Sequence, residues 1–336
     1  LRGRDPLLRI GALTALVRAR PADGVAAAGK VVEAVDGREP AEARVLYAAL
    51  ALLRAWCDGV RVDDRGPDDL ALVRATVDRL VARLAKVEEG RPRTEVAATL
   101  TALTRSGPAS ADARDWREWW AAVREGFVPP DAAPPAAAGS TTRVRFHGIP
   151  VGSQRLVFAQ DVSGGMRGAL DHRDPQSPSR LAFSLDELRR VLGSVDGALQ
   201  VDVAFFATTT RRAAGRLVPI GKVRPQLLDF VARVGAVTPT GQGQGRSNLH
   251  DTLAGLLLDE RIDTVYLLSE GGPTEGRFVD TERLLRHLER LNAYCQVQVH
   301  CLQVTESRPG AKFLRALAER MGGSFHDLAT LLGARR

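Results

Sequence analysis

The stretch Asp161-Val162-Ser163-Gly164-Gly165-Met166 is the part of the sequence that points most directly to the fold. It follows the apolar run at residues 155–160, so an acid and a hydroxyl come where a buried strand is expected to end. An Asp at a strand end, with a hydroxyl two residues later, can present oxygen ligands to a hard cation, while the glycines permit a tight turn. Turns of this composition are common, so the loop acquires meaning only from the segments around it.

Beyond residue 143 the sequence alternates between short apolar runs and longer amphipathic stretches. The predicted strands are residues 155–160, 200–207, 263–269 and 297–304, and the predicted helices are residues 184–192, 226–234, 249–258, 281–292 and 311–321. This alternation is typical of an α/β fold with a doubly wound, mostly parallel, Rossmann-like sheet. In such sheets ligands bind beyond the carboxyl ends of the strands, where the strand order reverses.

Two later loops add oxygen-bearing side chains at that same edge. The Gly-rich segment 240–249 (TGQGQGRSNL) offers Ser247 just before a predicted helix, and the strand at 263–269 ends in Ser269 and Glu270. This order resembles the von Willebrand factor A family. In that family a metal-ion-dependent adhesion site takes Asp-x-Ser-x-Ser from the first strand, a Thr from a middle loop and an Asp from a later strand. The resemblance covers residues 156–328.

The resemblance implies a cation site with two altered positions. Asp161 and Ser163 match the first two family ligands, Ser247 stands where the family has Thr, and Glu270 stands for Asp. The third serine is replaced by Gly165, which has no side-chain oxygen, and the extra methylene of Glu270 moves its carboxylate by about 1.5 Å. We therefore expect either a site for Mg²⁺, Mn²⁺ or Ca²⁺, built from Asp161, Ser163, Ser247 and Glu270, or a degenerate, metal-free site.

The first part of the chain has a different, helical period. Apolar stripes at three- and four-residue spacing occur at residues 6–18, 25–35, 41–57, 69–87 and 93–105, separated by breaks such as residues 21–24. We expect an all-α, HEAT-like repeat domain at 1–128, a Pro/Ala-rich linker at 129–142 and the von Willebrand A-like domain at 143–330. Such an order looks like a bacterial class that joins HEAT-like repeats to a von Willebrand A domain.

Several single residues have both a structural and a functional interpretation. Trp116 and Trp120 lie one helical turn apart and either close the end of the helical array or form a ligand platform. His147 is either a structural residue beside a strand or a ligand. Asp251 is either a charged neighbour of the cation site or an ordinary first-turn helix residue. The cysteines are expected to be buried thiols, because Cys295 and Cys301 would lie about 20 Å apart along a strand.

Three classes of function remain open. The main hypothesis is a non-enzymatic protein that binds a protein partner, through an acidic side chain of that partner at the von Willebrand A site and through the helical array. The alternative is RNA binding, because the Ro family of RNA-binding proteins also joins helical repeats to a von Willebrand A domain and the formal charge here is +7. A metal-dependent hydrolase is the third hypothesis.

Composition and motifs bear on these alternatives. Residues 1–130 hold 21 Arg and Lys against 19 Asp and Glu, which argues against a dedicated nucleic-acid surface. The Gly-x-Ser-x-Gly, His-Glu-x-x-His and phosphate-loop motifs of common enzymes do not occur. No apolar run reaches the length of a membrane span, and we expect a fragment or processed chain, since the sequence opens on Leu1. The cellular compartment is not assigned.

Overall fold

A computed structural model describes residues 5–59, 66–131, 144–236 and 245–327, which form two compact units. The units span Leu1–Thr141 and Thr142–Arg336, and each is described by itself. Most of the linker predicted at 129–142 lies outside the described residues, as does the segment 240–244 of the Gly-rich loop. The predicted domain boundaries stay predictions.

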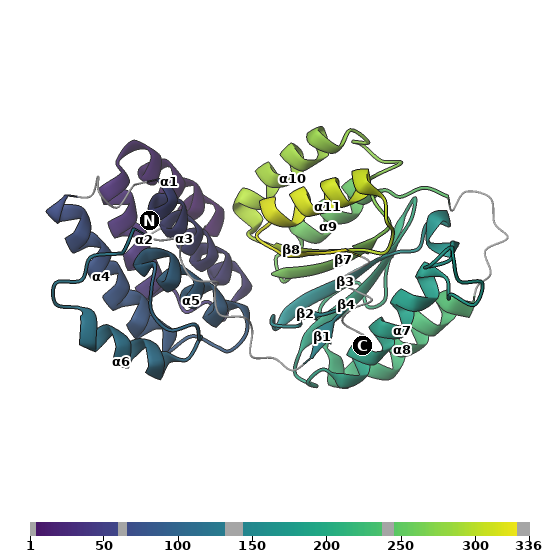
Figure 1. Cartoon of the computed structure of the whole chain (residues 1–336), viewed down its shortest axis with the longest axis horizontal. Coiled ribbons are helices and arrows are strands. Elements are labelled where there is room, and N and C mark those ends of the chain that lie inside the picture. Colours follow the sequence, from purple (N-terminus) through teal and green to yellow (C-terminus); the bar gives the residue numbers. More distant parts are fainter. Residues whose placement is uncertain (1–4, 60–65, 132–143, 237–244, 328–336) are drawn as a thin grey trace. The chain divides into compact units, whose positions relative to one another are not determined.

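The first unit is all-α in the residues that the structure describes (Figure 1). Its helices are α1 (Pro6–Ala19), α2 (Pro21–Ala34), α3 (Pro40–Gly59), α4 (Pro67–Leu84), α5 (Arg91–Thr104) and α6 (Ala113–Val123). Helix α2 packs against α1, α3 and α4, while α5 packs against α3 and α4. One apolar core joins them, so the amphipathic stripes of the sequence do face inward. The HEAT-like character of this unit stays a prediction.

One of the breaks predicted between helices of this unit is wrongly placed. The segment 21–24 was predicted to separate two helices, but α2 begins at Pro21. Proline is tolerated in the first helical turn, where its missing N–H would have no partner in any case. Gly24 then permits α1 and α2 to approach closely, because a Cβ at Gly24 would lie 2.4 Å from the Cα of Val17.

The tryptophan pair belongs to the core of this unit. Trp116 and Trp120 are both buried, and their indole N–H groups donate to the carbonyl of Ser110 at 2.8 Å and to the carboxylate of Asp78 at 2.8 Å. Buried rings with satisfied N–H groups close the helical array, as the structural interpretation predicts. Their faces are not available as a ligand platform.

The second unit is an α/β domain around one mostly parallel sheet, as the sequence predicts. Strands β3 (Arg155–Asp161), β4 (Gln200–Phe206), β7 (Thr264–Ser269), β8 (Gln298–Gln303) and β9 (Phe325–His326) run parallel, while β5 (Thr210–Arg212) and β6 (Val218–Pro219) pair antiparallel with β4. The order β5-β4-β3-β7-β8-β9 corresponds to the doubly wound order 3-2-1-4-5-6. Strands β5, β6 and β9 and the hairpin of β1 (Arg145–Phe146) and β2 (Ile149–Pro150) were not predicted, since two or three residues carry no periodicity.

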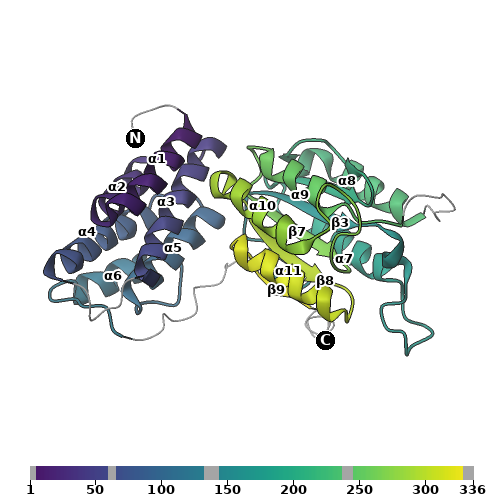
Figure 2. The same cartoon turned by 90° about the horizontal axis from the view of Figure 1, so that it is seen from above.

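Helices cover both faces of this sheet (Figures 1 and 2). Helices α7 (Arg180–Ser194) and α8 (Ile220–Ala236) pack with the hairpin on one face, and α9 (Leu249–Leu258), α10 (Thr281–Cys295) and α11 (Arg308–Arg320) pack on the other. Alternate strand residues point to opposite faces of the sheet. Phe158 therefore joins the core beneath α7 and α8, and Val157 joins the core beneath α9, α10 and α11. The predicted helices and strands are confirmed, with boundaries displaced by a few residues.

The remaining single-residue predictions can be placed within this frame. Cys57, Cys295 and Cys301 are all buried thiols, as the sequence predicts. His147 is buried and stacks on Phe183 of α7 with ring centroids 5.1 Å apart, in agreement with the structural interpretation. None of the helices in the described part of the chain is long and apolar enough to cross a membrane.

Candidate functional site at the carboxyl edge of the sheet

The candidate site lies where the chain changes direction across the sheet. From β3 the chain passes to β4 on one side, and it later returns to β7 on the other side of β3. The connection that leaves β3 runs toward β4, and the connection that leaves β7 runs toward β8 on the opposite side. The two connections therefore diverge at the carboxyl ends of β3 and β7 and leave a space there, which doubly wound folds use for ligands. Asp161 is the last residue of β3, and Glu270 follows the last residue of β7.

Asp161 is held entirely by neutral donors. It is fully buried, and its Oδ1 accepts from the backbone N–H of Ser163 at 2.9 Å. Its Oδ2 accepts from the hydroxyls of Ser269 at 2.7 Å and Ser247 at 3.3 Å. Burial raises the pKa of Asp161, and these hydrogen bonds oppose that rise. The structure thus brings together Asp161, Ser163 and Ser247, three of the four predicted residues.

Ser163 and Ser269 differ in how their hydroxyls are used. Ser163 is buried, and its hydroxyl approaches Asp161 without ordinary hydrogen-bond geometry, yet it opposes the rise in the pKa of that acid. Ser269 is also buried and donates to Asp161 at 2.7 Å, closer than Ser247 at 3.3 Å. The sequence analysis did not select Ser269, although a hydroxyl at the end of a buried strand, next to the selected Glu270, was the available signal.

Glu270 occupies the space that Gly165 leaves open. A Cβ at Gly165 would lie 1.8 Å from Oε1 and 2.0 Å from Oε2 of Glu270, which is inside the carboxylate. The two departures from the family pattern therefore compensate each other, since the longer acid fills the volume of the missing side chain. Partial burial and the neighbouring charge of Asp161 raise the pKa of Glu270, whereas Arg180 lowers it.

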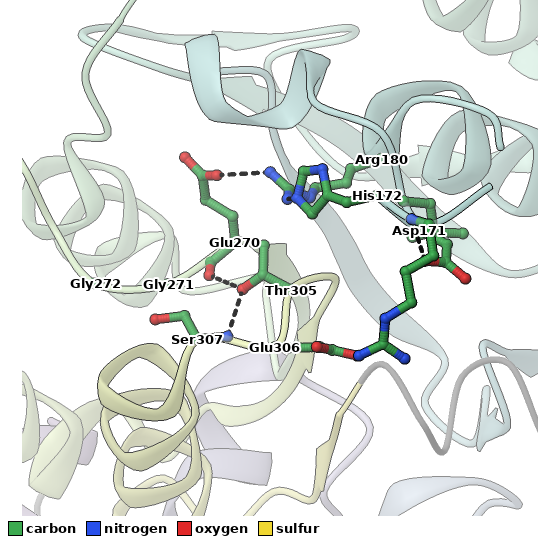
Figure 3. Close-up of a pocket in the computed structure, with 11 residues that line it drawn as sticks. Asp171, His172, Arg180, Glu270, Gly271, Gly272, Thr305, Glu306 and Ser307 are labelled. Carbon is green, nitrogen blue, oxygen red and sulfur yellow. Dashed lines mark hydrogen bonds and ion pairs between the residues drawn. The ribbon is translucent and has the colours of Figure 1, made fainter. Parts of the chain in front are cut away.

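Arg180, which was not predicted from the sequence, places a cation beside Glu270 (Figure 3). It is the first residue of α7, and its Nη1 lies 3.6 Å from Oε2 of Glu270 and donates to the carbonyl of Gly165 at 2.8 Å. Its Nη2 lies 2.9 Å from Nε2 of His172. The side chain is only 13% exposed. An Arg at the start of a helix is ordinary in sequence, so only the three-dimensional contacts distinguish it.

An open cavity of about 690 Å³ lies beside the Arg180–Glu270 pair (Figure 3). Three loops and the start of α7 line it, through Leu170, Asp171, His172, Arg173, Arg180, Glu270, Gly271, Gly272, Thr305, Glu306 and Ser307. Thr305 donates its hydroxyl to the carbonyl of Glu270 at 2.7 Å, which connects the loop before α11 to the loop after β7. Asp161, Ser163 and Ser247 are not among the lining residues. Charged and polar groups therefore line the cavity, while the buried side-chain oxygens of Asp161, Ser163 and Ser247 lie outside its lining.

Asp251 belongs to the start of α9 rather than to the cation site. Its carboxylate accepts from Asn248 at 2.7 Å and contacts Nδ1 of His250 at 2.6 Å. The hydrogen bonds with His250 and Asn248 lower the pKa of Asp251. These contacts agree with the interpretation as an ordinary first-turn acid.

A divalent cation does not fit the site as these side chains are arranged. Mg²⁺ requires about six oxygen ligands near octahedral positions, yet Gly165 supplies no side-chain oxygen and Glu270 is paired with Arg180. Among the described residues, no group of three or more His, Cys, Asp or Glu side chains is placed to hold a metal. Binding would require Glu270 to leave Arg180, and the predicted set of Asp161, Ser163, Ser247 and Glu270 stays a prediction.

No protein-family model and no curated protein matches this sequence. Similar solved structures include a von Willebrand factor type A protein from Catenulispora acidiphila, with 17% identity, a TM-score of 0.41, and coverage of 53% of this chain and 40% of that one. Manganese-loaded TRAP protein from Plasmodium vivax has 16% identity and a TM-score of 0.38, covering 54% and 71%. The conserved hypothetical protein BatB from Bacteroides thetaiotaomicron has 14% identity and a TM-score of 0.38, covering 54% and 95%. Likenesses at this level carry no functional argument, and the fold assignment rests on the strand order and register.

Proposed function

We propose that this chain is a non-enzymatic interaction protein that binds a protein partner through the rim at the carboxyl edge of its sheet. The observation that carries this proposal is the open cavity of about 690 Å³, with the Arg180–Glu270 ion pair on its wall at the point where the strand order reverses. Charged groups around a cavity at this position suit a polar or charged side chain of a partner. The resemblance of the Asp161 loop to von Willebrand A domains supports the same role.

The contacts of the cavity support a binding role over catalysis. A covalent or acid–base mechanism needs a nucleophile and a base within hydrogen-bond reach of each other. The hydroxyl of Thr305 donates to a backbone carbonyl, and that of Ser307 caps α11 by accepting from the N–H of Gly310 at 3.3 Å. The ring of His172 is engaged by Arg180. These groups are committed to holding loops in place.

The finer parts of the proposal concern what the partner contacts. An acidic side chain of the partner is the expected counterpart, bound directly on the rim beside Arg180. The helical unit is proposed as a second binding surface. Neither assignment is needed for the cavity itself to bind a partner.

Charge pairing in the helical unit weighs against the RNA-binding alternative. Many of its arginines are already engaged by carboxylates, including the pairs Arg9–Glu42, Arg54–Glu95, Arg79–Glu33, Arg93–Glu89 and Arg124–Asp78. A phosphate backbone would have to compete with those acids. A salt-sensitive mobility shift of the full chain with structured RNA would nevertheless favour that alternative.

Site-directed photo-crosslinking tests the proposed rim. A photoreactive residue is placed at Arg173, which is exposed and lines the cavity, and in a matched control at Glu260, which is exposed before β7 at the opposite edge. The full chain should give a discrete protein adduct from position 173 that excess unlabelled chain competes away, and none from position 260. Equal adducts from both positions, or none from either, would contradict a binding rim at the carboxyl edge.

A further inference from the structure

We propose that the guanidinium of Arg180 takes the place of a metal ion at this edge of the sheet. The site then needs no divalent cation, and Arg180 prevents one from binding. The inference rests on the contacts of one loop, one helix start and one strand end, and it holds whether or not the proposed partner exists. It explains why the site departs from the adhesion-site pattern at Gly165 and Glu270 together.

Two glycines create the space for this arrangement. Gly165 admits the carboxylate of Glu270, because any Cβ there would overlap both carboxylate oxygens at 1.8 and 2.0 Å. Gly168 admits the guanidinium, because a Cβ there would lie 2.9 Å from Nη1 of Arg180. Both glycines lie in the loop that follows Asp161. The loop is therefore shaped around an acid and an arginine rather than around serine ligands.

The guanidinium is also fixed in direction. Nη1 donates to the carbonyl of Gly165 at 2.8 Å, and Nη2 donates to Nε2 of His172 at 2.9 Å. Since a guanidinium has only donors, Nε2 of His172 is the acceptor and the ring hydrogen is on Nδ1. Glu270 then approaches the same guanidinium to 3.6 Å. These three neighbours hold the guanidinium of Arg180 in one position, whereas an exposed arginine would rotate freely.

The charges complete the argument. Asp161 is buried and accepts hydrogen bonds from neutral groups of Ser163, Ser247 and Ser269, and Glu270 adds a second carboxylate close enough for Asp161 to disfavour its ionisation. A guanidinium is always protonated in proteins, so it supplies one positive charge to this acidic pair. A divalent cation that enters beside Glu270 meets a fixed positive group and must break the contacts of Arg180 with Glu270. A single internal cation thus offsets one of the two negative charges and opposes entry of the ion.

Titration of the full chain with MnCl₂ by calorimetry tests this inference. The wild-type chain should give no saturable heat up to millimolar Mn²⁺. The triple variant Gly165→Ser, Arg180→Ala, Glu270→Asp restores the family ligands and removes the cation, so it should bind one Mn²⁺ at least tenfold more tightly than the wild type. Adding Asp161→Ala to the triple variant should abolish that binding.

Each outcome decides the inference. Saturable Mn²⁺ binding by the wild type that is lost in Asp161→Ala would overturn it, and so would a folded triple variant that fails to bind. If circular dichroism shows that the triple variant does not fold, the single variant Arg180→Gln decides instead: Mn²⁺ binding gained supports the inference, and none refutes it. Because Mn²⁺ alone is the probe, failure to find a protein partner leaves these results unchanged.

Discussion

The two ends of strands β3 and β7 each hold a buried aspartate, but they balance its charge in different ways. At the amino end, Asp263 accepts from the hydroxyls of Ser153 and Thr264 and pairs with Arg155, whose Nε lies 3.4 Å away. At the carboxyl end, the hydrogen bonds that Asp161 accepts from the described residues come from hydroxyls and one backbone amide.

The difference separates structural from functional use of a buried charge. An aspartate paired with an arginine inside the fold holds two strand ends together, and removing either charge leaves the other uncompensated. An aspartate held by neutral donors adds less to stability, because part of its desolvation remains unbalanced. At the carboxyl edge Arg180 instead pairs with Glu270 and lines the cavity. The stability that an arginine partner would add to a buried aspartate is therefore absent at the edge where the candidate site lies.

The largest expected effect is at the amino end. Asp263→Asn should lower the free energy of unfolding of the α/β unit by about 3 kcal/mol, because Arg155 loses its charged partner in a mostly buried position. Urea unfolding of the full chain, followed by circular dichroism, measures the change. Asp186→Asn, at an exposed acid on α7, is the control and should stay within about 0.5 kcal/mol of the wild type. A loss below about 1 kcal/mol for Asp263→Asn would remove the contrast between the two ends.

Gly165→Ala should have the next largest effect. The added methyl group displaces the carboxylate of Glu270, which is partly exposed and can turn toward solvent, so we expect a loss near the lower limit of overpacking, about 1 kcal/mol. Gly193→Ala on α7 meets no atom within 4 Å and should instead stabilise by a few tenths of a kcal/mol. The same urea experiment compares both variants. A neutral Gly165→Ala would mean that Glu270 does not lie over Gly165.

Asp161→Asn should change the free energy of unfolding less than Asp263→Asn or Gly165→Ala does. The substitution removes a buried charge that lacks an arginine partner, and the Ser247 and Ser269 hydroxyls can rotate to suit the amide. We expect a change of less than about 1 kcal/mol at pH 7, against about three times that for the matched change at Asp263. Chemical unfolding of the two Asn variants side by side provides the measurement. Equal losses would show that both aspartates serve the fold in the same way.

The smallest effect is a dependence on pH. The pKa of Asp161 is raised above its ordinary 3.8, so the folded state holds this proton more tightly than the unfolded state does. Its ionisation therefore lowers stability as pH rises from about 4 through the folded pKa, and the penalty is fully present above that value. The wild type should gain stability relative to Asp161→Asn as the pH falls from 7 toward 4. Unfolding free energies of both proteins at pH 7, 5.5 and 4 measure this, and a difference that stays constant down to pH 4 would contradict the raised pKa.

The fold and half of the site can be predicted from the sequence. The alternating runs after residue 143 identify the α/β sheet, because burial on one or both faces imposes a period that each segment carries by itself. Asp161, Ser163, Ser247 and Glu270 were instead selected through the resemblance of their loops to the von Willebrand factor A pattern, once the expected edge of the sheet was known. The short strands β5, β6 and β9 escaped because so few residues show no period.

The sequence by itself determined the order of helices and strands, and so the edge at which polar loops gather. Only the tertiary structure decided which charge occupies that edge. Arg180 reaches the carbonyl of Gly165 across fifteen residues, and Glu270 fills the volume of a side chain that Gly165 lacks. Such contacts depend on distances of a few ångströms between separate loops, which no periodicity records. The substitution of an arginine for a metal is therefore visible only once the chain is folded.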